Sequence, residues 1–413
     1  MARMTETDLD LRLARDGGRP ARTRSELPMF PGGMEIGDEE IEAVTRVLRS
    51  RNVFRYYGVG DGPHEVAEFE REFAAHLGAK HALCVNAGSS ALICGLIGAG
   101  VGPGDEVVIP AYTWNATANA VLATGAIPVL AEVDASLTLD PDDVVRKLTP
   151  KTRALLPVHM RGAPADMDAL SSIANEHDLA LIEDVCQSAG ATFRGRHLGT
   201  FGDAGAFSLQ FNKIITTGEG GVLITDRDDV YDLAIDVHDC AGSVRRGIGL
   251  PQFPGFNFRA SELQGAVARV QLGRLDGLLE RMRANQAWLA ERVAGLPGLT
   301  LRRRTDEDGD AGICLIAFAD TRALATSAAD ALQAEGVGAM LVYSPAIVDL
   351  HVYPYWKPVL EAIERSGRAA PDCPQTLDLV GRAIHVDLSP LADEQDLEEI
   401  ALAFAKVANA VLA

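Results

Sequence analysis

Between residues 81 and 185, short apolar runs alternate with segments of helical pattern, and this alternation constrains the fold more than any other feature of the chain. The runs lie at 81–86, 106–111, 127–133, 152–160 and 179–185. Short runs that are apolar throughout are typical of strands buried on both faces. The pattern therefore predicts an α/β fold with a mostly parallel central sheet flanked by helices, to which two further runs between residues 201 and 225 add later strands.

The chain has 413 residues, enough for about two domains of roughly 100–200 residues each. Residues 1–27 are polar, and we expect them to form an N-terminal arm that is mobile or docks on a neighbour. Residues 28–285 are expected to form the large domain and residues 286–413 a smaller C-terminal α+β domain. A long helical stretch at 261–296 would contain the boundary.

Charge and composition exclude several classes of protein. With 38 basic and 58 acidic residues, the formal net charge is −20, which disfavours binding to nucleic acid. No apolar run approaches the ~20 residues that span a bilayer, and the N-terminus lacks the apolar core of a signal peptide. The six cysteines are scattered and form no metal-binding pattern with histidine. We expect a cytoplasmic protein that binds neither membrane nor metal.

Three glycine-rich stretches differ in what precedes them. The stretch at 98–104 follows a helix and precedes a strand, the reverse of the dinucleotide-binding order, and the stretch at 58–62 follows no strand. Residues 87–90 (AGSS), in contrast, leave a predicted strand and begin a helix. Free N–H groups at such a helix N-terminus favour a phosphate.

Two further features complete a possible site. Asp184 ends an apolar strand at its carboxyl end, where open α/β sheets bind ligands, although an Asp there is often only a helix N-cap. Lys213 is a single lysine among apolar neighbours, and desolvation would make it a nucleophile, whereas most lysines are solvated. A phosphate cradle, a carboxylate for a pyridine nitrogen and a Schiff-base lysine are the parts of a pyridoxal phosphate site.

Longer motifs carry a resemblance to a known family. They are GDEVVIPAYTWNATANA (104–120), PVHMRGAPADMDAL (157–170), EDVCQSAGA (183–191), GDAGAFSLQFNKIITTGEGG (202–221) and GFNFRASELQGAVARVQL (255–272). With these motifs the chain resembles the DegT/StrS family of sugar and cyclitol aminotransferases, from about Gly33 to the C-terminus. The resemblance implies the fold-type-I architecture, an enzyme that is a transaminase, and pyridoxal 5'-phosphate as cofactor.

The resemblance also implies roles around the cofactor ring. Lys213 would form the Schiff base, and Asp184 would pair with the pyridine nitrogen. Gln187 would reach the phenolate side of the ring, and Trp114 would stack on it. Relatives that dehydrate a sugar carry histidine at the lysine position, so Lys213 favours amino transfer.

Other residues would hold the phosphate. By the resemblance, Gly88 and Ser89 bind it through backbone groups and Ser208 through its hydroxyl. Asn257 matches an asparagine that reaches the phosphate site of the neighbouring subunit, which implies a homodimer with composite active sites. His159 falls where the family has a histidine near the cofactor, and a purely structural histidine is the alternative.

The substrates are less constrained. Residues 13–24 and 373–378 resemble the branch that aminates cyclitol ketones with L-glutamine or L-glutamate, in antibiotic biosynthesis. One alternative acceptor is a nucleotide-linked keto-sugar, whose diphosphate Arg245 and Arg246 would bind. An alternative reaction is an aromatising dehydration of the 3-amino-5-hydroxybenzoate type. A non-catalytic protein of this fold is a third alternative, but such a protein would be expected to lack the lysine or the aspartate, and both are present here. Four loop residues are candidates for selectivity: Tyr56, Tyr57, Tyr343 and His351.

Overall fold

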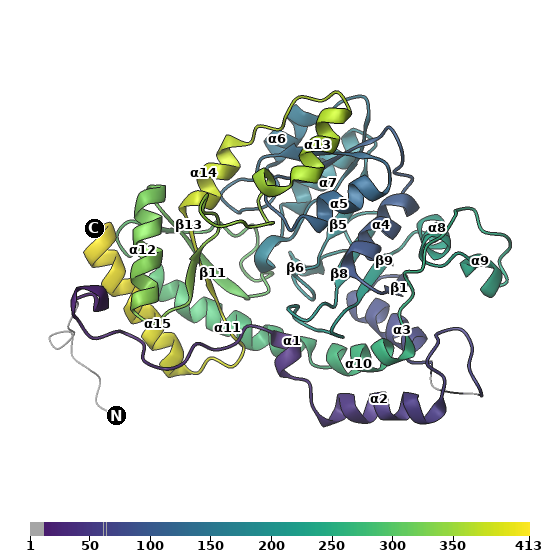
Figure 1. Ribbon diagram of the computed structural model, residues 1–413, viewed down its shortest axis with the longest axis horizontal. Coiled ribbons are helices and arrows are strands. Elements are labelled where there is room, and N and C mark those ends of the chain that lie inside the picture. Colours follow the sequence, from purple (N-terminus) through teal and green to yellow (C-terminus); the bar gives the residue numbers. More distant parts are fainter. Residues whose placement is uncertain (1–11, 61, 63) are drawn as a thin grey trace.

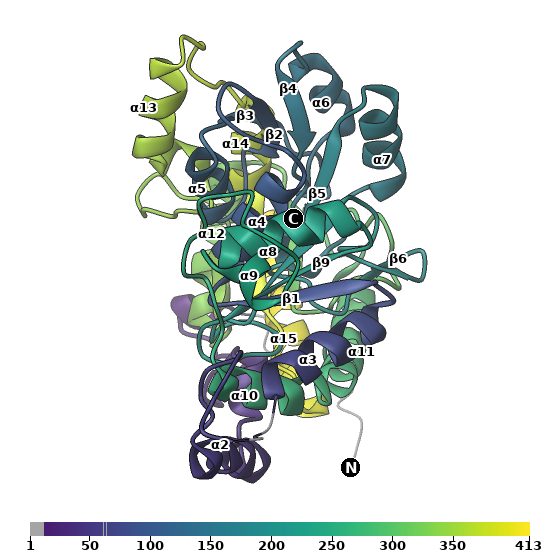
Figure 2. The same ribbon diagram turned by 90° about the vertical axis from the view of Figure 1, so that its right-hand side faces the viewer.

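A computed structural model describes residues 12–60, 62 and 64–413, arranged as a large and a small sheet, each with its own helices (Figure 1, Figure 2). The first eleven residues of the expected N-terminal arm lie outside the described residues. Within the described part, no helix combines the length and the apolar character needed to cross a membrane.

The large sheet has seven strands in the spatial order β1-β9-β8-β5-β4-β2-β3. Their bounds are β1 His81–Val85, β2 Glu106–Pro110, β3 Ile127–Ala131, β4 Thr152–Leu155, β5 Ala180–Asp184, β8 Ala204–Ser208 and β9 Gly221–Thr225. The strands from β8 to β3 are parallel, and β9 is antiparallel to both of its neighbours. The predicted α/β fold with a mostly parallel sheet is confirmed.

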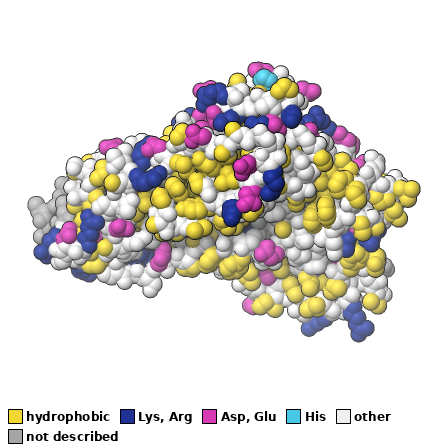
Figure 3. All heavy atoms as spheres, turned by 45° about the horizontal axis from the view of Figure 1, so that its top comes forward, with side chains coloured by type: hydrophobic (Ala, Val, Ile, Leu, Met, Phe, Trp, Pro, Cys, Tyr) yellow, Lys and Arg dark blue, Asp and Glu magenta, His cyan; other side chains and the backbone are white. Residues whose placement is uncertain are grey.

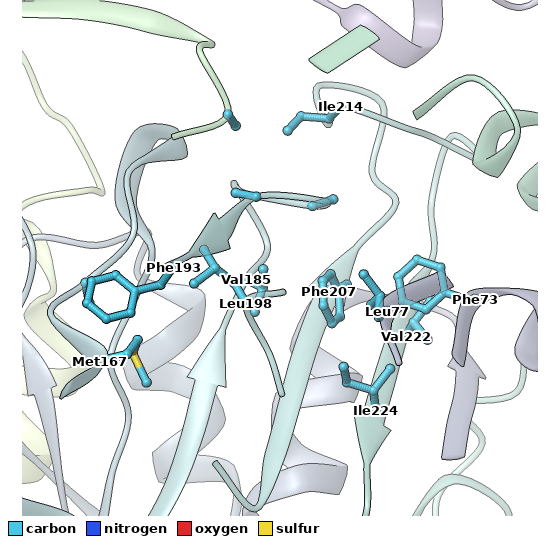
Figure 4. Close-up of a cluster of buried hydrophobic side chains, with 14 of the residues drawn as sticks. Phe73, Leu77, Met167, Val185, Phe193, Leu198, Phe207, Ile214, Val222 and Ile224 are labelled. Atoms are coloured by element: carbon cyan, nitrogen blue, oxygen red, sulfur yellow. The ribbon is translucent and has the colours of Figure 1, made fainter. Parts of the chain in front are cut away.

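Helices cover both faces of this sheet. On one face α3 (Glu65–Leu77), α7 (Met167–Glu176) and the start of α11 (Leu275–Val293) enclose the cluster of buried side chains in Figure 4. On the other face lie α4 (Gly88–Gly98), α5 (Ala116–Ala123) and α8 (Asp228–His238). Successive residues of a strand point to opposite faces, so Cys84 joins the first cluster and Leu83 the second.

The small sheet is antiparallel, in the order β10-β11-β13-β12. Its strands are β10 Leu299–Leu301, β11 Cys314–Ala319, β12 Ala339–Leu341 and β13 Ala383–Asp387, and its helices are α12 Arg322–Ala334, α14 Pro374–Arg382 and α15 Glu394–Val407. The remaining elements are short or peripheral: α1 Pro31–Met34, α2 Asp38–Ser50, α6 Pro141–Lys147, α9 Gly242–Arg245, α13 Lys357–Arg365, the strand pair β6 Thr192–Phe193 and β7 Arg196–His197, three 3-10 turns at Ala14–Asp16, Met160–Gly162 and Tyr353–Tyr355, and a final π-turn at Ala408–Leu412.

The helical stretch expected at 261–296 is two helices, α10 (Glu262–Leu272) and α11, separated at Gly273 and Arg274. The start of α11, including Leu278, packs in the core of the large sheet, whereas Leu289 near its end packs in that of the small sheet. We therefore propose that the boundary between domains of residues 28–285 and 286–413 falls within this helix.

One helix beyond that boundary returns to the large sheet. Trp356, Val359 and Ile363, in and next to α13, are buried in the core that α4 and α5 share. Figure 1 shows α13 beside α5, far from the small sheet. The C-terminal part of the chain thus forms the small sheet and its helices and also covers an edge of the large domain.

The described part of the arm binds its own chain. Glu335 accepts hydrogen bonds from the backbone N–H of Ala14 (2.7 Å) and of Ala21 (2.8 Å). The buried Lys406 amine contacts both Glu335 (2.5 Å) and the carbonyl of Arg19 (2.7 Å). A mobile or neighbour-bound arm was the expectation from sequence; residues 14–21 differ because the small domain supplies a buried carboxylate that satisfies their backbone.

Candidate active site

Asp184 lies at the carboxyl end of β5, in the middle of the large sheet, and its side chain is nearly inaccessible (4% exposed for the residue). One carboxylate oxygen accepts from the Thr117 hydroxyl (2.8 Å) and the other from the backbone N–H of Cys186 (3.1 Å). Among the described residues no cation lies within ion-pair distance of Asp184. A buried carboxylate bonded only by neutral donors fits a ligand that carries a positive charge, such as a protonated pyridine ring.

The adjacent acid, Glu183, points away from this site. Its carboxylate accepts from the backbone N–H groups of Gly199 (2.7 Å), Phe201 (2.7 Å) and Gly202 (3.0 Å). It also contacts Nε2 of His159 at 3.1 Å. The side chains of the acidic pair therefore separate, as expected on a strand, and Glu183 is fully occupied within the fold.

The contacts of His159 are those of a histidine bonded within the fold. It is buried, its Nδ1 accepts from the backbone N–H of Ala165 (3.1 Å), and its Nε2 faces Glu183. With Nδ1 as acceptor, Nε2 is the donor in that contact. Both ring nitrogens are used within the chain, which favours the structural alternative.

The helix N-terminus predicted to bind phosphate begins at Gly88. Ala87, the N-cap residue of α4, has no side-chain capping bond, so the first N–H groups of the helix are available to a ligand. A Cβ at position 88 would lie 2.8 Å from Cβ of Ser208 and 3.0 Å from Sγ of Cys186. The close approach brings Gly88, Ser208 and the segment after Asp184 together, while Ser89, the second residue of the helix, is exposed.

Lys213 is half-buried in the turn after β8 and lines a cavity of about 580 Å³ between the two domains. Other residues of the cavity wall include Arg22, Pro28, Arg161, Gln187, His351 and Asp387. The wall thus combines the end of the large sheet, the docked arm and strand β13 of the small sheet. Ile214, next to Lys213, is buried at the edge of the cluster in Figure 4.

Gln187 and Trp114 lie at this end of the sheet as well. The Gln187 side-chain oxygen accepts from the backbone N–H of Arg161 (3.1 Å), which fixes the amide in the cavity wall. Trp114 is 44% exposed, and its ring centroid lies 4.9 Å from that of His351. Of the four loop residues singled out for selectivity, His351 lines the cavity.

Asn257 is exposed, and its backbone carbonyl accepts from the side chain of Asn86 (3.4 Å), two residues before Gly88. It therefore lies near the phosphate cradle of its own chain with a side chain not bonded within the described residues.

The cations proposed for a nucleotide diphosphate already have partners. Arg245 pairs with the buried Asp239 at 2.8 Å, and Arg259 reaches the other oxygen of this carboxylate at 2.7 Å. Arg246 lies 4.0 Å from Asp232. Tyr56 is bonded to Nε2 of His238 at 3.1 Å, so these loops are ordered by contacts within the chain.

Two residues of the site were not anticipated from sequence. Thr117, one turn after Trp114, bonds Asp184, and Arg161 contributes its backbone to Gln187 and its side chain to the cavity. Both occur inside the quoted motifs, but neither residue type has a spacing that marks it as functional.

Comparison with known proteins agrees with this geometry. The sequence profile of the DegT/DnrJ/EryC1/StrS aminotransferase family matches residues 34–405. A putative L-glutamine:3-amino-2,3-dideoxy-scyllo-inosose aminotransferase of Streptoalloteichus tenebrarius is 36% identical over 293 residues, 70% of this chain and 68% of that one. GDP-perosamine synthase of Caulobacter vibrioides is 40% identical over 241 residues, 56% of this chain and 62% of that one.

A solved structure shows the same fold. The crystal structure of 3-amino-5-hydroxybenzoic acid synthase superposes with a TM-score of 0.78 at 29% identity, covering 95% of this chain and all of that one (100%). The three similar proteins have names that point to three different products, so the fold and the family do not by themselves fix the acceptor.

Proposed function

The chain belongs to the DegT/DnrJ/EryC1/StrS aminotransferase family, and we propose that it moves an amino group from L-glutamine or L-glutamate to a ketone of a cyclitol or sugar-like intermediate in natural-product biosynthesis. It is an enzyme that uses pyridoxal phosphate, as the family does. The observation that carries the proposal is a cavity lined by Lys213 and Gln187, three residues after the buried Asp184 that ends β5.

When bound, pyridoxal phosphate supplies an electrophilic carbonyl and an electron sink for amino transfer. Lys213 is the nucleophile of the site and, once its amine is free, the base and acid that moves a proton.

The other residues bind and orient the cofactor. Asp184, whose carboxylate Thr117 holds in place, would pair with the ring nitrogen and stabilise a positive charge there. Gln187 would border the phenolate side of the ring, and Trp114 would stack on the ring. Gly88, Ser89 and Ser208 would hold the phosphate at the N-terminus of α4.

The choice of acceptor rests on the inosose aminotransferase relative. Residues 13–24 and 373–378, which suggested the cyclitol branch, form polar contacts within the chain: Arg22, which also lines the cavity, pairs with Asp396 at 2.7 Å, and the Thr376 hydroxyl donates to Glu132 at 2.6 Å. Against a nucleotide-linked acceptor stands the pairing of Arg245 with Asp239; in its favour stands the perosamine synthase relative.

Incubation of purified enzyme with L-glutamine and either free inososes or nucleotide-linked keto-sugars, with mass spectrometry of the products, tests the proposal. We expect amination of an inosose, no product with Lys213→Ala, and little effect of the double variant Arg245→Ala/Arg246→Ala. Amination of nucleotide-linked sugars alone, abolished in that double variant, would replace the cyclitol by the alternative. An aromatic product formed without consumption of donor would identify the dehydratase reaction.

We further propose a cytoplasmic homodimer with composite active sites. All six cysteines are free thiols, which supports a reducing compartment. On α2 the apolar side chains of Ile41 and Leu48 are exposed in the single chain, whereas Val47 is buried. The exposed Asn257 next to the phosphate cradle supports a second copy of the chain as the partner that covers such surfaces.

A further inference from the structure

Arg161 occupies an unusual backbone position at the cavity. It lies in the turn Met160–Gly162 with φ 53° and ψ 44°, the left-handed region that residues other than glycine rarely adopt. Its N–H donates to Gln187, and its carbonyl accepts from the Arg302 guanidinium (3.3 Å). Bonds on both sides of the residue thus hold a strained conformation that directs an arginine side chain into the wall of the cavity.

The guanidinium of Arg161 forms no ion pair with the described residues. Within the described ranges, no carboxylate lies within 4.0 Å of it, and its Nε is buried without a hydrogen-bond partner. Two other cations near the cavity differ in this respect, because Arg22 pairs with Asp396 (2.7 Å) and Arg302 with Asp310 (3.2 Å). Arg161 is only partly exposed, and a cation in such a position without an ion pair is stabilised by an anionic ligand.

The surroundings of Arg161 favour an anion rather than another protein group. The phenol of Tyr112 and the thiol of Cys314 interact with it electrostatically, and Asp387, also in the cavity wall, acts on it from beyond ion-pair distance. Burial lowers the pKa of His351, and the charges of Arg161 and Lys213 act in the same direction. Both cations and His351 therefore line the same cavity and interact electrostatically.

We propose that Arg161 binds the α-carboxylate of the amino donor and thereby places the donor's α-amino group towards Lys213. A guanidinium binds a carboxylate through two parallel hydrogen bonds, which fixes orientation as well as position. The phosphate cradle at Gly88 is built from another part of the sheet, so Arg161 remains free for substrate. The inference rests on the proposed function, because it needs an amino acid as donor.

The variant Arg161→Gln, loaded with cofactor, tests the role with two donors. L-Glutaminol has a hydroxymethyl group in place of the α-carboxylate of L-glutamine. We expect kcat/KM for L-glutamine to fall about 100-fold, mainly through KM, and that for L-glutaminol to change little, because two charge-assisted bonds are lost only with the carboxylate. Arg161→Lys, which keeps the charge but not the fork, should lie between.

A binding measurement separates this role from a structural one. Glutarate has carboxylates but no amino group to react; titrated calorimetrically into the holoenzyme, it should bind the wild type and lose at least about 10-fold in affinity in Arg161→Gln. Arg153→Gln, on the exposed start of β4, is the matched control and should preserve both the donor preference and glutarate binding.

The possible failures are distinct. If Arg161→Gln lowers activity with both donors equally and leaves glutarate binding unchanged, Arg161 is not the carboxylate ligand, although the proposed function stands. If the wild type transfers no amino group from L-glutamine or L-glutamate, the proposed function fails first.

Discussion

Asp184 is a buried carboxylate that the chain itself bonds only with neutral groups, and this makes its charge available to the cofactor. Asp184→Asn preserves the shape but removes the charge, so we expect the cofactor to stay bound and kcat to fall at least about 100-fold. Absorbance measures the cofactor content of the variant, and steady-state kinetics measure its kcat. Thr117→Val, which removes one bond worth about 1 kcal/mol, should cost only several-fold. An Asp184→Asn enzyme with wild-type kcat would show that the ring partner lies elsewhere.

Single residues were predictable where a residue type stands out at a strand end. Asp184 follows an apolar strand and Lys213 is isolated among apolar neighbours, so both could be singled out. Arg161 and Thr117 could not, because their roles depend on residues far along the chain: the Thr117 hydroxyl donates to Asp184, and Arg161 lines the same cavity as Lys213 and His351. The sequence pattern shows neither distance.

At the scale of elements, the start of α4 is the part of the site where the packing leaves the least room for a larger side chain. Gly88→Ala would place a methyl group 2.8 Å from Ser208, and overpacking of this kind costs roughly 1–3 kcal/mol. We expect the affinity for pyridoxal phosphate, titrated into the apoenzyme, to fall about 10-fold or more. Gly102→Ala, where a Cβ meets nothing within 4 Å, is the control and should bind normally. Equal affinities of the two variants would contradict a phosphate cradle at Gly88.

The apolar runs predicted which segments form strands, but they did not predict the order of the strands across the sheet. The run at 81–86 became β1, yet its pairing with β9 depends on which edges remain free after the parallel strands assemble. The break at Gly273 between α10 and α11 was missed because an isolated glycine inside a helical pattern does not always end the helix. The apolar pattern of α2 indicated a helix, although Ile41 remains 61% exposed in the single chain.

For the whole molecule, the buried pair Lys406–Glu335 joins the arm, α12 and α15. Glu335→Gln leaves the Lys406 charge buried without a counter-charge, so we expect the free energy of unfolding to fall by about 3–5 kcal/mol. Urea denaturation measures it. Combining Glu335→Gln with Lys406→Met should restore part of the loss, because no buried charge then remains. Strictly additive effects of the two substitutions would show that the pair is not coupled.

A composite active site predicts that two inactive variants recover activity when they form mixed dimers. If Asn257 completes the phosphate site of a second copy, each active site uses Lys213 from one chain and Asn257 from the other. The substitutions Lys213→Ala and Asn257→Ala then affect residues that different chains contribute to one site. Homodimers of either variant should be impaired, but mixed dimers contain one site with both residues intact. Equimolar refolding of the two variants should then recover about a quarter of wild-type activity, since half of the dimers are mixed and each has one working site.

If Asn257 instead serves its own chain, beside Asn86, no mixed dimer has an intact site and activity stays at the level of the separate variants. Sedimentation of the mixture confirms that dimers have formed, and an active monomer would contradict the composite site altogether.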